Sequence, residues 1–523
     1  MQTKSIYHPL RKLVVAGNPN AVKCKKEKID LEPLSVNPLD DYLLQHNINA
    51  VTYHAFVKKI SCQVLTPFDP GYQAARQLSD PLFNHFPIII VYCTGIADVV
   101  MSIKFCQSQP GLACCLRAGG HNTAGYSSIT NRLLIDVSNI KGINVNQDAM
   151  TVTVGAGTTW GEFNYEMNVY GLHTPGGGCS TVGMTGFTLG GGYGYTSIQW
   201  GMACDNLLEI TLVNASGDII VANSNQHADL YWACRGGTGG NFGVVVSLTY
   251  QLYALKMVWP IQINWPISDA AEVLFTWQNQ MTKTLSDTAL GLLGFLACQE
   301  VTTKTASGNS CTINEPYFCL RGIYTGASSV NGQAAISPLL SIGSPTFPVP
   351  LWKKQLPYAE VNEHLLDQVE AVIPDSALET KRSAYIKNAL SIAQYQTIVD
   401  YFCTTPSLYN LCSFEPYGGA ILNVAATDTA FVHRDAYFDV FTDSFWINET
   451  DKPNAYSWLY NFFQSTEMQG LFSDEYYQNY ANATYPDWQN GYFGENYPQL
   501  QQVKLTWDPN NFFHFPQSIE LPQ

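Results

Sequence analysis

The sequence is poor in charged residues. They make up 13% of the 523 residues, about half of the ~25% in an average domain. Lys and Arg number 27 against 42 Asp and Glu, so the net charge is −15. Binding to nucleic acid or to an anionic membrane surface needs concentrated Lys and Arg. The composition therefore argues against both kinds of partner.

Long hydrophobic runs are also missing. The apolar stretches at residues 86–92 and 289–298 are far shorter than the ~20 residues of a membrane helix. Residues 1–21 contain basic side chains but no sustained apolar segment of the kind found in signal peptides. We therefore expect no membrane-spanning segment, and the sequence shows no secretory signal.

Several widespread functional motifs are absent. The chain has no G-x-G-x-x-G, no G-x-x-x-x-G-K-[ST], no H-E-x-x-H, no G-x-S-x-G and no C-x-x-C. These absences remove the usual signatures of a Rossmann dinucleotide site, a P-loop, a zinc protease, an α/β-hydrolase and a zinc ribbon. We expect no metal site.

Cysteine and glycosylation signals are present. Among 14 Cys, the pairs Cys311/Cys319 and Cys403/Cys412 are close enough in sequence to be plausible local disulfides. Glycosylation sequons begin at three asparagines, which would fit a glycoprotein: Asn214, Asn448 and Asn482.

Glycine is abundant and clustered. Of 40 Gly, many fall in residues 174–194 and 235–243. Such segments permit positive φ and a close approach of the backbone to a ligand. Glycine thins out after about residue 255, and the last fifty residues return to a compact motif. We predict a leader at 1–40, a first domain at 41–254, an inserted α+β domain at 255–474 and a return to the first domain at 475–523.

Local patterns predict the elements of the first domain. Short β-branched runs indicate strands at residues 87–92, 133–136 and 151–154, and helical spacing indicates helices at 96–107 and 160–170. Residues 207–213 and 219–221, separated by Asn214-Ala-Ser-Gly217, indicate a hairpin.

Two glycine-flanked side chains are candidates for ligand contact. In Arg117-Ala-Gly-Gly-His121-Asn-Thr123, consecutive backbone N–H groups beside an Arg could hold a pyrophosphate, with His121 at the edge. Cys179 lies between Gly178 and Ser180. Taken singly, a tight turn and an inert buried thiol explain these residues as well.

Taken together, the motifs resemble one family. Their order is similar to that of the berberine-bridge-enzyme branch of FAD-linked oxidases, in the vanillyl-alcohol-oxidase superfamily. The resemblance covers residues 62–253 and 476–519, and the middle matches more loosely. The matching motifs are Arg117-Ala-Gly-Gly-His121, Gly178-Cys-Ser-Thr-Val-Gly183, Asp205-Asn206, Arg235-Gly-Gly-Thr-Gly-Gly-Asn-Phe-Gly243, Tyr492-Phe-Gly-Glu-Asn496, Asp508-Pro-Asn-Asn-Phe512 and Phe515-Pro-Gln-Ser-Ile519.

The resemblance implies a fold and a cofactor. The expected fold is α+β, with a two-part FAD-binding domain of the PCMH type and an inserted antiparallel sheet covered by helices. It implies FAD bonded through its 8α-methyl to His121 and through C6 to Cys179. The residues expected at the cofactor are His121, Cys179, Arg117, Ala118, Gly119, Gly120, Asn122, Thr123, Thr181, Val182, Gly183, Gly186, Gly191, Gly192, Asp205, Asn206, Gly239, Asn241, Gly243, Tyr492 and Asn496.

The resemblance also implies catalytic residues. Tyr477-Gln-Asn-Tyr480 is similar to a family motif that lines the substrate cavity, so we expect Tyr480 as the base, with Tyr477 second and Tyr193 a further candidate. One of these phenols is expected to have a pKa lowered by its neighbours. Asn423 falls where berberine bridge enzyme has an acid, and an amide is no base. This difference argues against amine oxidation.

The expected reaction is oxidation of an alcohol carbon with release of hydrogen peroxide. Val182 resembles the family's oxidase pattern, in which a small side chain leaves dioxygen room. The leading substrate hypothesis is C1 of a reducing sugar such as cellobiose, giving a lactone. The alternatives are an allylic or phenolic alcohol or a secondary metabolite, and a silent flavoprotein that binds a glycan. We expect a monomer. The resemblance implies a secreted protein.

Overall fold

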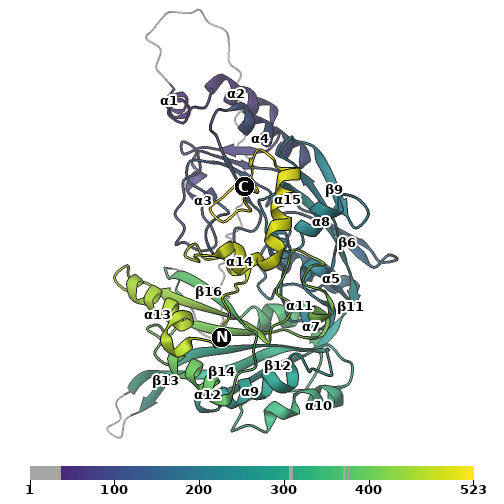
Figure 1. Cartoon of the computed structure of the whole chain (residues 1–523), viewed down its shortest axis with the longest axis vertical. Coiled ribbons are helices and arrows are strands. Elements are labelled where there is room, and N and C mark those ends of the chain that lie inside the picture. The colour runs from purple at the N-terminus through teal and green to yellow at the C-terminus, as the bar shows by residue number, and fades with distance from the viewer. Residues whose placement is uncertain (1–36, 305–309, 369–372, 375) are drawn as a thin grey trace, which may run out of the picture.

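The computed structural model describes residues 37–304, 310–368, 373–374 and 376–523. Nearly all of the expected leader at 1–40 lies outside them. Two groups of elements stack along the long axis of the molecule (Figure 1). We call α1 to β11 with α14 and α15 the first unit, and β12 to α13 the inserted unit. Each group surrounds its own large hydrophobic cluster.

The first unit contains a four-stranded sheet and a five-stranded sheet. The four-stranded sheet has the order β1-β2-β4-β3, with β2 and β3 parallel to β4; its strands are β1 (Gln63–Leu65), β2 (Ile89–Tyr92), β3 (Cys114–Arg117) and β4 (Leu133–Asp136). The antiparallel five-stranded sheet has the order β5-β6-β10-β8-β9; its strands are β5 (Ile143–Asn146), β6 (Thr151–Gly155), β8 (Leu207–Val213), β9 (Ile219–Asn223) and β10 (Val244–Gln251). A small pair joins β7 (Leu172–His173) and β11 (Tyr253–Ala254).

The elements predicted for this unit are confirmed. The helix expected at 160–170 is α5 (Trp160–Tyr170), which a Thr159–Glu162 capping box begins and Gly171, at φ 67°, ends. The expected hairpin is the antiparallel pair β8–β9. The other helices are α1 (Pro38–Gln45), α2 (Ala50–Lys59), α3 (Tyr72–Ala75), α4 (Ile96–Ser108), α6 (Met184–Leu189), α7 (Ser197–Trp200) and α8 (Ala228–Ala233).

A seven-stranded antiparallel sheet forms the inserted unit. Its order is β15-β12-β14-β13-β17-β18-β16, and its strands are β12 (Met257–Pro266), β13 (Leu290–Lys304), β14 (Ser310–Tyr324), β15 (Leu356–Pro357), β16 (Leu378–Ile386), β17 (Leu411–Pro416) and β18 (Phe438–Trp446). Its helices are α9 (Ala270–Met281), α10 (Ser329–Leu340), α11 (Tyr358–Val361), α12 (Ile392–Phe402) and α13 (Lys452–Gln464). The expected α+β class and helix-covered antiparallel sheet are confirmed.

The two faces of this sheet differ in chemistry. Phe438 and Val440 of β18 belong to the hydrophobic cluster that includes residues of α9, α10, α12 and α13. Side chains alternate along a strand, so Asp439, Phe441 and Asp443 project from the opposite face. The polar face of the sheet is therefore available to the first unit.

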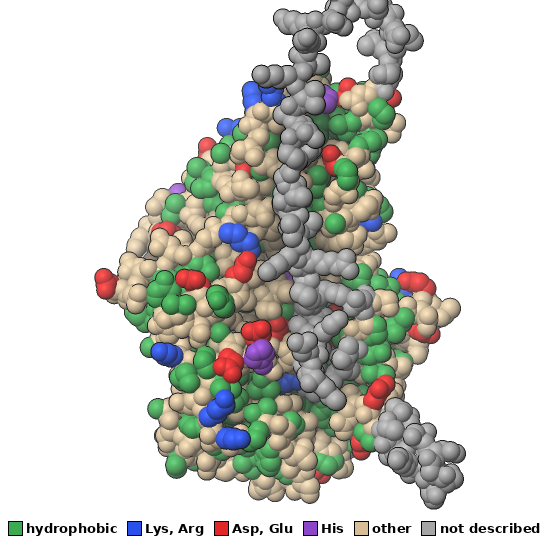
Figure 2. Space-filling view, turned by 180° about the vertical axis from the view of Figure 1, so that it is seen from behind, with side chains coloured by type: hydrophobic (Ala, Val, Ile, Leu, Met, Phe, Trp, Pro, Cys, Tyr) green, Lys and Arg blue, Asp and Glu red, His purple; other side chains and the backbone are tan. Residues whose placement is uncertain are grey.

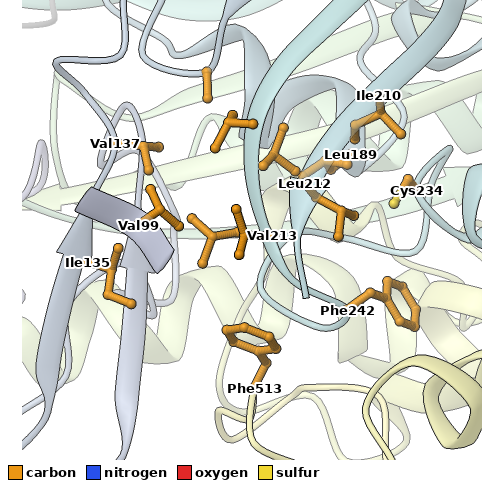
Figure 3. Close-up of a cluster of buried hydrophobic side chains, with 14 of the residues drawn as sticks. Val99, Ile135, Val137, Leu189, Ile210, Leu212, Val213, Cys234, Phe242 and Phe513 are labelled. Carbon is orange, nitrogen blue, oxygen red and sulfur yellow. The ribbon is translucent and has the colours of Figure 1, made fainter. Parts of the chain in front are cut away.

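The C-terminal segment packs into the core of the first unit. Helices α14 (Trp488–Phe493) and α15 (Tyr497–Trp507) return the chain to that unit (Figure 1). Figure 3 shows Phe513 pointing into a cluster with Val213 and Ile135. The Lys504 ammonium, fully buried, donates to Asp508 Oδ2 (2.8 Å), which ties the last turn of α15 to this core.

The expected disulfides are wrong. Cys311 and Cys319 lie on the same extended strand, β14, eight residues apart, where ~3.3 Å per residue keeps them too far apart to bond. Cys403, exposed, and Cys412, buried, are both free thiols. Asn482 of the third sequon is buried and donates to Lys381 O (2.7 Å). The side chain of Asn482 therefore holds the backbone of β16 in place.

The described surface carries few charges. In Figure 2, charged side chains are scattered between neutral and hydrophobic ones, without a broad Lys/Arg patch on the visible described face. Within the described part of the chain, no helix combines the length and apolar character that a membrane crossing requires.

Candidate active site

A cavity of about 1030 Å³ lies where the glycine-rich loops of the first unit meet the polar face of the inserted sheet. Its size is at the top of the ~300–1,000 Å³ range of small-molecule sites. The walls include segments around residues 117–123, 177–187 and 238–245 of the first unit and strands β13, β17 and β18. It can accommodate a large ligand.

His121 and Cys179, 58 residues apart in sequence, meet at this cavity. Thr181 Oγ1 is 3.1 Å from His121 Nε2 and 3.4 Å from Cys179 Sγ. Burial lowers the pKa of His121 to about 4, so its imidazole is neutral at physiological pH. Burial likewise raises the pKa of Cys179 to about 12. The two predicted attachment residues therefore face one space.

The glycines around them allow a backbone contact that side chains would block. A Cβ on Gly119 would lie 2.5 Å from Gly183 N, and one on Gly183 would lie 2.8 Å from Gly119 N. Gly120, at φ 77°, turns the chain toward His121. A cradle of exposed backbone beside a neutral imidazole and a thiol fits a flavin dinucleotide with two attachment points.

Most of the residues predicted at the cofactor line the cavity. They are His121, Cys179, Arg117, Ala118, Gly119, Gly120, Asn122, Thr123, Thr181, Val182, Gly183, Gly186, Gly239, Gly243 and Tyr492. The residues that do not line it are Gly191, Gly192, Asp205, Asn206, Asn241 and Asn496.

Arg117 needs a correction. Its buried guanidinium pairs with Asp136 and donates to the carbonyl oxygens of Ala75 (2.7 Å) and Gln77 (3.2 Å). The predicted contact between this guanidinium and a pyrophosphate is therefore wrong. Arg117 instead anchors the segment that precedes the cavity.

Asp205, Asn206 and Asn241 also have structural partners. Asp205 accepts two 2.7 Å hydrogen bonds from Arg434. Asn206 donates to Trp200 O and Met202 O, each at 2.9 Å. Asn241 Oδ1 accepts from Ile519 N (2.8 Å), which joins the second glycine cluster to the C-terminus.

Asn496 and the glycine pair act in the same indirect way. Asn496 donates to Ala426 O (2.7 Å), away from the cavity. Gly191 and Gly192 have φ of 117° and 86°, which turn the backbone N–H of Gly192 toward Tyr477. Their direct contact with a cofactor stays a prediction.

Tyr480 has an acid partner that sequence reasoning missed. Its hydroxyl donates to Glu415 Oε1 (2.9 Å), and both residues line the cavity. Burial raises the pKa of Glu415 to about 8. The pKa of Tyr480 is raised well above 10 by burial and by Glu415, which corrects the expectation of a lowered value. A signal existed, since Glu415 is the one acid within the strand-forming run Leu411–Pro416.

Tyr477 is held by donors. Its oxygen accepts from Gly192 N (2.8 Å), Tyr193 N (3.3 Å) and Asn479 Nδ2 (2.8 Å). The Asn479 amide orientation is fixed because the same nitrogen donates to Phe187 O (2.8 Å), which can only accept. Burial nevertheless raises the pKa of Tyr477 well above 10. Its contacts fix its position beside Tyr480, with 4.9 Å between the two ring centroids.

The remaining predicted catalytic residues are less suited to that role. Tyr193 lines the cavity, but its hydroxyl donates to Pro416 O (2.9 Å). Its ring stacks on the ring of Tyr417. Asn423 is exposed, in a 3₁₀ turn (Gly419–Asn423) rather than a strand. It does not line the cavity, so its predicted place at the site is wrong; the acid that pairs with Tyr480 there is Glu415 of β17.

Further charged groups surround Glu415. Lys381 of β16 is 2.8 Å from Asp443 Oδ1 and lies over the rings of Phe441 and Tyr480, with 4.4 and 5.1 Å to their centroids. Asp439, opposite Glu415 in the β17–β18 register, is fully buried, and burial and Glu415 raise its pKa well above the usual range. Among the described residues, no group of His, Cys, Asp and Glu is arranged to hold a metal ion.

Part of the wall beside the Tyr480–Glu415 pair is apolar. It comes from Leu293 and Phe295 of β13 and Phe441 of β18, whose ring centroid is 4.5 Å from that of Tyr480. Polar groups line the same wall: the Lys381 ammonium lies 5.1 Å from the Tyr480 ring centroid and 2.8 Å from Asp443 Oδ1.

Known proteins resemble this chain along most of its length. A family model described as the FAD binding domain matches residues 87–223, and one described as berberine and berberine like matches residues 476–520. The uncharacterized FAD-linked oxidoreductase YgaK of Bacillus subtilis is 30% identical over 88% of this chain and 97% of its own length. Monolignol oxidoreductase AtBBE-like 13 of Arabidopsis thaliana is 24% identical over 92% of this chain and 90% of its own.

Solved structures share the fold. Physcomitrella patens BBE-like 1 superposes with a TM-score of 0.77 at 24% identity, over 90% of this chain and 99% of that one. A chitooligosaccharide oxidase superposes with a TM-score of 0.74 at 21% identity, over 90% of this chain and 100% of that one. With the paired glycine loops, the two matched family models and a relative at 30% identity, this chain belongs to the berberine-bridge-enzyme-like family of FAD-linked oxidoreductases.

Proposed function

We propose that the protein is an FAD-dependent alcohol oxidase that uses Tyr480 and Glu415 together as its base. FAD, attached through His121 and Cys179, would supply a hydride acceptor that is reoxidised by dioxygen to give hydrogen peroxide. The observation that carries the proposal is the 2.9 Å hydrogen bond from Tyr480 to Glu415 at the wall of the cavity.

Tyr480 and Glu415 together can accept the proton that the substrate hydroxyl releases. Oxidation of an alcohol carbon releases a proton from the hydroxyl group as the hydride leaves. A buried phenol with a pKa above 10 does not ionise by itself near neutral pH. Glu415, with a pKa of about 8, takes the Tyr480 proton while the phenol oxygen takes the proton of the substrate. Tyr480 thus passes a proton to Glu415 rather than standing as a phenolate.

The walls favour an apolar alcohol next to the base. Leu293, Phe295 and Phe441 offer ring-sized apolar surface and no hydrogen-bond partner from their side chains. An allylic or benzylic alcohol buries its ring there without leaving polar groups unsatisfied. This placement supports the second of the two sequence-based substrate hypotheses, and the name of the Arabidopsis relative is consistent with it.

A reducing sugar is the second candidate. The polar lining, formed by Lys381 over the Tyr480 ring and its partners Asp443 and Glu379, could hydrogen-bond several hydroxyl groups. A sugar would, however, bring its reacting end against the apolar walls at an energetic cost. The fold shared with a chitooligosaccharide oxidase is consistent with this candidate.

Oxygen uptake with peroxide detection separates the candidates. We would compare cinnamyl and benzyl alcohols with glucose, cellobiose and chito-oligosaccharides, using the full-length flavin-containing protein. Peroxide formation from the aromatic alcohols supports the proposed substrate class. Peroxide formation from sugars alone would instead identify a reducing sugar as the substrate. Peroxide from neither, together with no anaerobic bleaching of the flavin, would reject an alcohol oxidase and favour a silent flavoprotein.

Val182 provides a test of the oxidase assignment. Its side chain lines the cavity three residues after Cys179. We expect Val182→Leu to slow flavin reoxidation by dioxygen about 10-fold or more, because the extra methylene fills the space that dioxygen enters. Anaerobic reduction by substrate should stay within about twofold of wild type. Val182→Ala is the matched control, and equal reoxidation rates in Val182→Leu and wild type would refute a dioxygen path past this side chain.

A further inference from the structure

Two thiols face each other at the edge of the four-stranded sheet of the first unit. Cys62 directly precedes β1 and Cys93 directly follows β2. The antiparallel register pairs Gln63 with Tyr92, so the next pair outward is Cys62 and Cys93. Directly opposed residues in such a pair have Cβ atoms ~4.5–5.5 Å apart, close to what a disulfide needs. The nearby Cys62 side chain, together with burial, raises the pKa of the Cys93 thiol above its usual value.

The position of Cys93 is fixed from both sides. Its N–H donates to Asp136 O of the neighbouring strand β4 (2.8 Å), and its thiol is fully buried. Cys62 is partly exposed, so the pair lies within reach of small molecules from solvent. One accessible thiol beside one fixed thiol is the arrangement that favours oxidation to an intramolecular disulfide.

We propose that Cys62 and Cys93 are a modification site, where hydrogen peroxide joins them in a cross-strand disulfide. Each thiol gives up one proton and one electron, the S–S bond forms, the O–O bond of peroxide breaks, and two water molecules leave. Peroxide is also the product of the proposed oxidase reaction, but the site requires only that peroxide be present.

The bond would close a loop that supports the cavity. Between the two cysteines, Ala75 O and Gln77 O accept hydrogen bonds from Arg117, and Ser79 N donates to Gly120 O (3.2 Å), next to His121. Ser79 and Asp80 themselves line the cavity. Closing this loop restricts the unfolded chain and so stabilises the folded cradle around His121.

A second thiol pair provides an internal control. Cys106 is also close enough to Cys114 to raise the pKa of its thiol, but both residues are buried, and Cys106 Sγ donates to Leu112 O (3.1 Å). Unlike the pair at Cys62, neither cysteine of this pair is partly exposed to solvent. We therefore expect this pair to stay reduced under conditions that oxidise Cys62 and Cys93. Exposed Cys403 reports that the reagent has reacted.

Peptide mapping of the full-length, flavin-containing protein tests the site. After reduction, removal of reductant and treatment with peroxide, alkylation and digestion without reductant should give one cross-linked peptide pair containing Cys62 and Cys93. Cys106 and Cys114 should be recovered as alkylated thiols. Recovery of alkylated Cys62 and Cys93 after Cys403 has been oxidised would overturn the proposal, whether or not any substrate is oxidised.

Thermal unfolding gives a second readout. The peroxide-treated wild type should melt roughly 5 °C above the reduced protein. Cys62→Ser, at the partly exposed position, should fold and show no difference between the two treatments. An equal shift in Cys62→Ser and wild type would place the stabilising bond elsewhere and reject the pair.

Discussion

Replacing Tyr480 by Phe should lower the rate of anaerobic flavin reduction by about 10²–10⁴-fold, the usual contribution of a positioned acid–base group. The hydroxyl of Tyr480 is the only part removed, and with it the 2.9 Å bond that leads the proton to Glu415. The ring, which packs 4.5 Å from Phe441, remains. Stopped-flow bleaching of the flavin with an active alcohol measures this rate directly.

Two controls separate chemistry from structure. Tyr480→Phe should contain as much flavin as wild type, because Tyr480 contributes no donor to the glycine cradle. Tyr193→Phe removes a hydroxyl that already donates to Pro416 O, so we expect a much smaller change in rate. A larger effect at Tyr193 than at Tyr480 would move the base to the glycine loop.

The double variant His121→Ala with Cys179→Ala should lose all covalently bound flavin. In the wild type and in each single variant, the denatured protein should weigh more than its polypeptide by one FAD, since either bond alone retains the cofactor. Mass spectrometry of acid-denatured protein measures this. A wild-type mass equal to that of the polypeptide would contradict both attachments.

The two bonds should differ in their dependence on pH. His121, with a pKa of about 4, is neutral and able to react throughout the physiological range. Burial raises the pKa of Cys179 to about 12, so its thiolate is scarce at neutral pH. In apoprotein supplied with FAD, the bond to Cys179 should therefore form more slowly and accelerate as pH rises.

Local sequence patterns were sufficient to predict α5 and the β8–β9 hairpin of the first unit. The periodicity of residues 160–170 and the glycine that follows them specify α5 and its end, and the turn at 214–217 specifies the β8–β9 hairpin. Cysteine pairing depends on contacts that sequence spacing does not encode. The pair predicted on β14 is separated by eight residues of extended strand, whereas Cys62 and Cys93 meet through a register between two strands.

At the site, motif residues could be located but their partners could not. His121 and Cys179 line the cavity as expected, yet the Arg117 guanidinium turns to backbone carbonyls of the α3 region. Glu415 could not be predicted as a site residue, because its contact with Tyr480 requires β17 to lie beside the C-terminal segment. That contact joins residues 65 positions apart and has no local signal.

The most direct test of the Tyr480–Glu415 pair is the pH dependence of anaerobic flavin reduction in wild type and in Glu415→Gln. Glu415 accepts a proton only when ionised, so the wild-type rate should rise with pH and level off above the Glu415 pKa of about 8. In Glu415→Gln the rate should fall about 10²-fold or more and lose this rise. A wild-type profile that is flat through this range, or a Glu415→Gln variant that keeps the wild-type profile, would contradict a base formed by Tyr480 and Glu415.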